Sequence, residues 1–154
     1  MKKLLFILVI LPFMVNAQDA PENAKVVYFS LKATKQEALK RIERTFFDYY
    51  FTSCWYSSDS TIIISKERDL TQGGVISCRM FTAMIRIEQN QGNSTIFITG
   101  TGAMDITGMN KTDKVIACNS RSNAKVTWDA VMVLANGINK GESLLSYEIL
   151  TKSE

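Results

Sequence analysis

The strongest constraint on the fold is a run of alternating apolar residues on both sides of a glycine turn. The run reads "AMIRIEQ", "NQGNS" and "TIFITGTG", and it extends from Ala83 to Gly102. Side chains along a strand point to alternate faces, so this pattern is typical of two antiparallel strands that each bury one face. Ile85 and Ile87 mark the buried face of the first strand. Such a sheet needs a second layer over that face, and the rest of the chain must supply it.

A second hairpin is predicted immediately before it, over "IIISKERDLTQGGVISCRMF". The isoleucines at 62–64 indicate a buried strand, the charged and glycine-containing segment indicates a turn, and residues 75–81 indicate the returning strand. Cys78 lies between two apolar neighbours on one face, whereas a reactive thiolate needs a cationic partner and some exposure. The apolar residues change face near Phe81, which predicts a β-bulge or bend there.

Two helices are predicted, one on each side of these strands in the sequence. The first begins at a capping box formed by Thr34 and Glu37. The second begins near Ser122 or Asn123. Both carry apolar residues at three- and four-residue steps, as amphipathic helices do. The stripes are Leu39, Ile42, Phe46 and Tyr49 in the first helix, and Val131, Leu134 and Ile138 in the second.

A strand over "KVVYFSLKA" precedes the first helix, with Val27, Phe29 and Leu31 on one face. The order strand, helix, several antiparallel strands and helix predicts an α+β fold. We expect an antiparallel sheet of about five strands with two helices packed on one face. The tail 140–154 is ambiguous between helix and strand.

The chain begins like a secretory signal peptide. Lys2 and Lys3 precede 12 apolar residues, and small residues at Val15 and Ala17 indicate cleavage after Ala17. A membrane-spanning helix needs about 20 apolar residues, so no integral membrane segment is expected after processing. The sequence therefore predicts a signal peptide at 1–17, a polar leader at 18–24 and one domain at 25–154. The mature protein is expected to be periplasmic or secreted.

Composition excludes several function classes. Loss of Lys2 and Lys3 with the signal leaves 16 basic and 15 acidic residues, so the mature chain lacks the basic field that nucleic-acid binding requires. The chain has no histidine, which removes Ser-His-Asp and Cys-His catalysis and histidine-containing zinc sites. No catalytic residue, metal ligand or cofactor motif is assigned, and the sequence favours a non-enzymatic role.

Three cysteines enter an oxidising compartment on export: Cys54, Cys78 and Cys118. Two of them can form one disulfide, and three pairings are open. The alternative is that all three are small buried side chains.

Aromatic residues gather at the end of the first helix and in the segment that follows it. Seven of the fifteen lie between Phe46 and Tyr56, and one helix stripe cannot bury them all. Exposed aromatics with polar tips favour contact with proteins or glycans. The candidate binding residues are Tyr50, Phe51, Trp55 and Tyr56. The alternative is that the loop after the helix folds back and buries them.

The signal peptide, the strand–helix opening and the "GGVI" hairpin resemble small exported domains of Gram-negative, Bacteroidetes-type envelopes, over Val26 to Gly102. The resemblance implies a TBP-like α+β fold and offers no catalytic residues. From the clustered aromatic residues and the lack of catalytic motifs, we expect a binding or interaction module of the cell envelope with an unknown protein or glycan partner. Two alternatives stay open: a carrier of a small apolar ligand, and an envelope enzyme that uses carboxylates such as Asp59 and Glu67.

Overall fold

The computed structural model describes residues 24–66, 68–69, 78–105, 112–115 and 123–149. The predicted signal peptide and most of the leader lie outside these ranges and stay predictions of the sequence. The elements in chain order are β1 (Val26–Leu31), α1 (Lys35–Asp48), β2 (Ser53–Tyr56), β3 (Ile62–Ser65), β4 (Arg68–Asp69), β5 (Cys78–Asn90), β6 (Asn93–Asp105), β7 (Thr112–Val115), α2 (Asn123–Asn139) and β8 (Ser146–Glu148).

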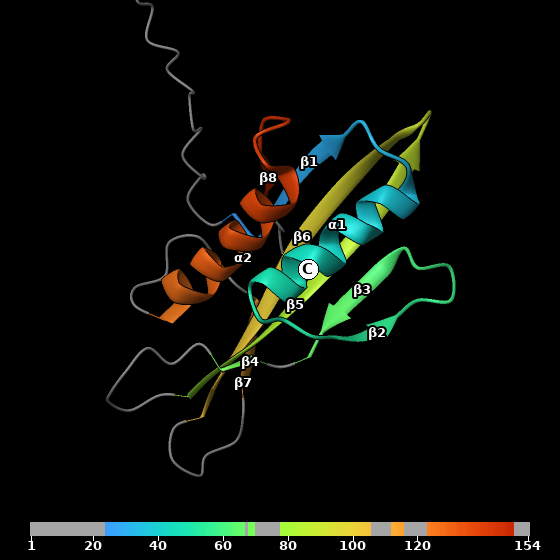
Figure 1. Ribbon diagram of the computed structural model, residues 1–154. Coiled ribbons are helices and arrows are strands. Elements are labelled where there is room, and N and C mark those ends of the chain that lie inside the picture. Colours follow the sequence, from blue (N-terminus) through green and yellow to red (C-terminus); the bar gives the residue numbers. More distant parts are fainter. Residues whose placement is uncertain (1–23, 67, 70–77, 106–111, 116–122, 150–154) are drawn as a thin grey trace, which may run out of the picture.

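The strands form one antiparallel sheet that is covered by two helices (Figure 1). Its order is β2-β3-β5-β6-β1-β8, with short β4 paired to β5 and short β7 paired to β6. The predicted α+β class with two helices on the sheet is confirmed. The ambiguous tail contributes an edge strand, β8, which pairs with β1.

The long β5–β6 hairpin is the centre of the sheet, as the alternating pattern predicts. Its register is continuous from Cys78↔Asp105 to Asn90↔Asn93. Gln91 and Gly92 form the turn with φ of 45° and 84°. Positive φ at both central residues is what a two-residue type I′ turn requires, and glycine adopts it without steric cost.

The prediction was a bulge or bend near Phe81, and the continuous register shows that β5 has no bulge against β6 there. The irregularity lies instead in the segment that joins β3 to β4 and runs alongside β5. From Ile64 to Arg68 the chain advances four residues, while β5 advances three from Met84 to Phe81. The backbone N–H of Ala83 donates to the buried Ser65 hydroxyl at 2.8 Å, so a side chain replaces a ladder bond there.

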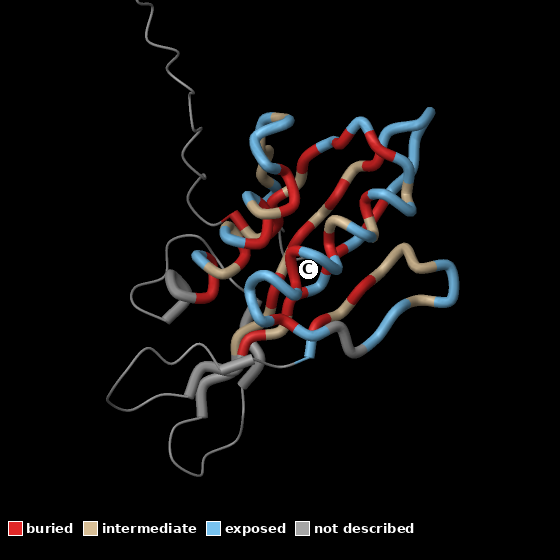
Figure 2. The backbone as a smooth tube through the Cα atoms, in the orientation of Figure 1, coloured by how far each residue is buried: buried red, intermediate tan, exposed pale blue. Residues whose placement is uncertain are grey.

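The core fills the space between one face of the sheet and the two helices. Figure 2 shows buried residues along the central strands and on the sheet-facing sides of both helices. The alternation places every second residue of β1, β5 and β6 on this face, and burial of these side chains is the main driving force for the two-layer arrangement. The largest fully buried side chains are Phe29, Leu31, Ile42, Phe46, Ile63, Phe81, Ile85, Ile87, Ile96, Ile98 and Leu134.

Helix α1 begins as predicted, at a complete capping box. The backbone N–H of Glu37 donates to the Thr34 hydroxyl at 3.4 Å, and the backbone N–H of Thr34 donates to the Glu37 carboxylate at 2.8 Å. The Glu37 carboxylate accepts hydrogen bonds from the Thr34 backbone N–H and, at 2.9 Å, from the Thr34 hydroxyl, and these two bonds lower the pKa of Glu37. The buried face of the helix consists of Ala38, Ile42, Thr45 and Phe46, whereas Tyr49 of the predicted stripe is exposed.

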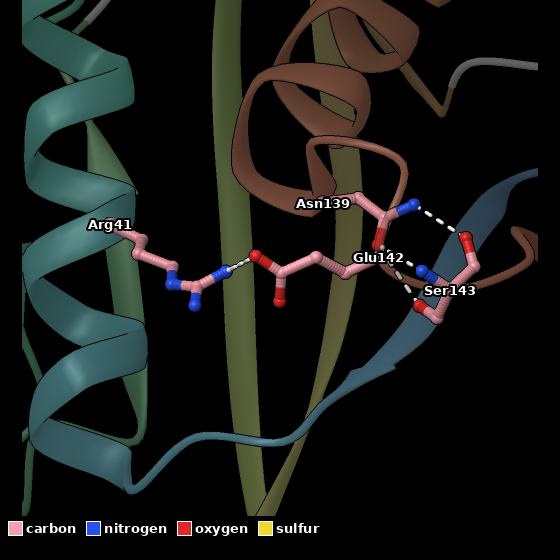
Figure 3. Close-up of polar contacts among 4 residues, drawn as sticks. All are labelled: Arg41, Asn139, Glu142 and Ser143. Carbon is pink, nitrogen blue, oxygen red and sulfur yellow. Dashed lines mark hydrogen bonds and ion pairs between the residues drawn. The ribbon is translucent and has the colours of Figure 1, made fainter.

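A polar bridge joins the two helices at the surface (Figure 3). Arg41 of α1 contacts Glu142, just beyond α2, with 2.6 Å between Nη1 and Oε1. Asn139 at the end of α2 is buried, and its amide group makes hydrogen bonds to the backbone and the hydroxyl of Ser143. The buried amide thus terminates α2 and positions the segment that carries Glu142.

The helices approach each other closely at Gly137 of α2. A Cβ atom at this position would lie 2.8 Å from Thr45 Cγ2 and 2.8 Å from Tyr49 Cε2 of α1. Thr45 is buried and its methyl group has little room to move, whereas the Tyr49 ring is at the surface. The absence of a side chain at Gly137 therefore sets the distance between the helices.

Replacing Gly137 by alanine should destabilise the protein by about 1 kcal/mol. Overpacking costs about 1–3 kcal/mol, and the better helix propensity of alanine recovers about 1 kcal/mol of that. The check is urea unfolding of Gly137→Ala alone and in a Thr45→Ser background, where the clashing methyl is absent. Equal destabilisation in both backgrounds would show that the close approach at Thr45 is not the cause.

Candidate functional site

Helix α1 ends in a Schellman motif that fixes the backbone of the aromatic segment. The N–H of Phe51 donates to the carbonyl of Phe46 at 2.7 Å, and the N–H of Tyr50 donates to the carbonyl of Phe47 at 3.1 Å. These are the two hydrogen bonds of the motif. The rings of Phe46 and Phe51 also lie 5.8 Å apart, which supplies its usual apolar contact. The path of the chain out of α1 is therefore well determined.

Tyr50 occupies the position of this motif where glycine is preferred. Its φ is 59°, in the left-handed region. A side chain there meets the following carbonyl group and costs roughly 1–2 kcal/mol. The Tyr50 side chain is 84% exposed, so burial does not compensate for that cost.

Phe47, one turn earlier, is 82% exposed and adjoins the same region. An open depression of about 560 Å³ lies here, lined by Phe47, Asp48, Tyr50, Phe51 and Thr52. We name its rim, formed by Phe47, Asp48, Tyr50 and Thr52, the helix-end surface. Large exposed aromatic side chains beside a depression are a feature of contact surfaces.

Phe51 forms the base of this region and belongs to the core. It is 5% exposed and packs between Phe46 and Phe81, whose ring lies edge-on to it at 5.8 Å. Of the four predicted binding residues, Phe51 is thus the one that cannot offer its ring to a partner. Its role is to hold the exposed Tyr50 in place, because the two residues are adjacent within the motif.

Trp55 and Tyr56 in β2 point to opposite faces of the sheet. Tyr56 pairs with Ile63, which faces the helices, and its hydroxyl donates to the Glu43 carboxylate of α1 at 3.2 Å. Trp55 pairs with Ile64 and lies on the uncovered face, where it is 49% exposed. The structure therefore does not bring the predicted residues into one surface. Tyr50 lies at the helix end, Tyr56 beside α1, and Trp55 on the opposite side of the sheet.

Phe47 is the residue that sequence reasoning left out of the candidate set. A signal was present, because Phe46 and Phe47 are adjacent in a helix and point about 100° apart. If Phe46 lies on the buried stripe with Ile42, Phe47 must leave it. The helical pattern alone was thus sufficient to predict that Phe47 is exposed.

The predicted cysteine pairing falls outside the described residues. The side chains of Cys54 and Cys78 and the whole of Cys118 lie outside the described residues. The single disulfide and its pairing therefore stay predictions. Within the described ranges, no group of three or more His, Cys, Asp or Glu could hold a metal ion.

The carboxylate alternative named Asp59 and Glu67, and Glu67 lies outside the described part of the chain. Asp59 sits in the β2–β3 turn, where its Oδ1 accepts hydrogen bonds from the Ser57 hydroxyl at 2.6 Å and the Thr61 hydroxyl at 2.8 Å. These bonds, with one from the Thr61 backbone N–H, lower the pKa of Asp59 to about 2. A general acid needs a raised pKa, so the hydrogen bonding of Asp59 suits a turn-forming residue.

Asp59 should titrate near pH 2, and Ser57→Ala should move its pKa up toward 3.8, the value of a free aspartate. Because the folded pKa is lowered, the stabilisation from ionised Asp59 is present above about pH 4 and is lost as the pH falls toward 2. Carbon-13 NMR of the carboxyl group over that range measures it. An unchanged pKa in Ser57→Ala would contradict the hydrogen-bond origin.

Phe51→Ala should destabilise the domain by about 3–5 kcal/mol, as expected for removal of a buried ring. The matched change Phe47→Ala, four residues earlier, should alter stability by less than about 0.5 kcal/mol because that ring is in solvent. Chemical denaturation of the two variants compares the same substitution in the two environments. Similar losses in both would mean that Phe47 is packed against the protein.

Comparison with family models and with curated proteins finds no match to this chain. Neither of the two described helices is long and apolar enough to cross a membrane.

Proposed function

We propose that this chain is an exported, non-enzymatic binding module of the cell envelope that contacts a partner through the helix-end surface. Export is supported by the predicted signal peptide. Binding is supported by two large exposed aromatic side chains, Phe47 and Tyr50, on the rim of one depression.

The single observation that carries the proposal is the backbone of Tyr50. Glycine at this position would end the helix with less strain. The Tyr50 ring is exposed, so it does not stabilise the fold through burial. Strained residues at surface positions are a feature of binding and active sites, where the side chain is kept for function. Four described non-glycine residues have positive φ, and Tyr50 is the aromatic one. The other three are Ser60, Gln91 and Lys140.

The shape of the site favours a macromolecular partner over a small apolar ligand. The depression is open to solvent, and its floor is the buried Phe51. Small-molecule sites enclose most of their ligand, whereas partners of larger size are met by exposed aromatic residues with a polar rim. Asp48 and Thr52 supply such polar groups beside the two rings.

Tyr50→Gly should raise the free energy of unfolding by about 1 kcal/mol, because glycine adopts positive φ freely. The same variant should lose partner binding. The matched control is Lys140→Gly at the end of α2, where φ is 50°. It should also stabilise the fold but leave binding unchanged. Urea unfolding of each variant measures the change in stability, and a binding measurement on each variant measures the change in affinity for the partner.

The binding measurement requires the partner, which native mass spectrometry of the protein recovered from its own cells would reveal as an adduct or second chain. The partner would then be purified and recombined with the wild type and with Phe47→Ala, Tyr50→Ala and Trp55→Ala. The first two should weaken the complex, and Trp55→Ala should not, because Trp55 lies on the other face of the sheet. A complex weakened by Trp55→Ala alone would overturn the proposed surface.

A further inference from the structure

Two features place negative charge at the helix-end surface. Helix dipoles place partial negative charge at the C-terminal end of a helix, and α1 has no basic residue in its last turn to offset it. Asp48, the last residue of α1, adds a full negative charge on the rim of the depression. A cation placed here would therefore be attracted by the carboxylate and by the helix end together.

The two exposed rings add a second feature that favours cations. The faces of aromatic rings carry negative electrostatic potential, so a cation above the ring is attracted to it. Phe47 and Tyr50 border the same depression as Asp48, which brings aromatic faces and a carboxylate onto one rim.

We propose that the helix-end surface binds an arginine side chain of a partner protein. A guanidinium group can stack on an aromatic face while its N–H groups donate to a carboxylate, and an ammonium group can do only one of these with directed geometry. The inference deepens the proposed function by naming the chemistry of the partner at that same surface.

Each of the two contacts, a guanidinium group over an aromatic ring and a guanidinium group on a carboxylate, already occurs within the molecule. On the uncovered face of the sheet, the guanidinium carbon of Arg86 lies 4.3 Å from the centre of the Phe97 ring. At the helix bridge, Arg41 contacts the Glu142 carboxylate at 2.6 Å. The proposed site differs in that the aromatic faces and the carboxylate are exposed and the arginine comes from outside.

Among the described residues, Arg44 competes with the proposed ligand. Arg44 lies one turn before Asp48, and its Nε is 3.9 Å from the Asp48 carboxylate, with both side chains largely in solvent. A contact of this length between exposed groups is weak, so an incoming guanidinium can replace it. Arg44 should thus reduce the affinity for the ligand without closing the site.

The test uses the folded protein and a pair of blocked peptides, acetyl-Gly-Arg-Gly-amide and its citrulline twin, followed by NMR. Citrulline keeps the planar shape and removes the charge. The arginine peptide should bind roughly 5- to 30-fold more tightly, with shifts centred on Phe47, Asp48 and Tyr50. Equal affinity of the two peptides would overturn the inference.

Two charge variants separate this role from a structural one. Asp48→Asn should reduce the preference for arginine over citrulline, whereas Arg44→Gln should roughly double the affinity for the arginine peptide by freeing the carboxylate. Loss of a structural ion pair would move both variants in the same direction. Changes of the same sign would therefore count against the proposal, and Trp55→Ala should change neither.

Failure of the arginine assignment can be distinguished from failure of the proposed binding function. If the partner identified in the cell binds through Phe47 and Tyr50 while the arginine peptide does not bind at this surface, the arginine assignment fails and the binding module stands. If substitution of the partner's contacting arginine by citrulline or glutamine abolishes the complex, both are supported.

Discussion

The fold depends on the β5–β6 ladder having one face that must be covered. Phe81, Ala83, Ile85 and Ile87 of β5 lie on that face and are fully or almost fully buried, and β6 contributes Ile96 and Ile98 beside them. A continuous register fixes which side chains share the face, because a slip of one residue would move them all to the other side. The two helices and the flanking strands are then placed by the same requirement, each adding apolar side chains to the one covered layer. Burial determines that both helices pack on this face. The close approach at Gly137 and the bridge from Arg41 to Glu142 then determine how the helices lie against each other.

The candidate site is a by-product of how α1 ends on that layer. Ile42 and Phe46 hold the helix against the sheet, and Phe51 returns the chain into the core immediately after the last turn. Between these two anchors the backbone must reverse within a few residues, which forces Tyr50 into the left-handed region and into solvent. The backbone that carries the exposed aromatic groups is thus anchored by buried ones on both sides.

Local patterns were sufficient to predict much of this architecture. The capping box at Thr34 and the stripe of Val131, Leu134 and Ile138 depend on neighbours within one or two turns, and the structure contains both. The division of the aromatic segment into buried and exposed residues depends on longer-range events. Phe51 is buried because a Schellman motif forms without its usual glycine, and that motif has no signature when tyrosine replaces glycine. Trp55 and Tyr56 point in opposite directions because adjacent residues of a strand alternate between its two faces. Which of the two faces the helices depends on the pairing of β2 with β3, which includes a register shift between Ser53 and Trp55 that apolar periodicity does not reveal.

The position of β1 in the sheet has a consequence for the order in which the chain can assemble. The central hairpin closes through a two-residue turn, but Val27 must meet both Ile98 and Tyr147, far along the sequence. Closing long loops costs more entropy than closing short ones, and non-local strand pairing is slow for that reason. A chain that emerges N-terminus first therefore presents β1 and the apolar stripe of α1 before any of their partners exist. During that interval the opening segment is a strand without neighbours and a helix without a sheet, which makes protection from aggregation part of the protein's biogenesis.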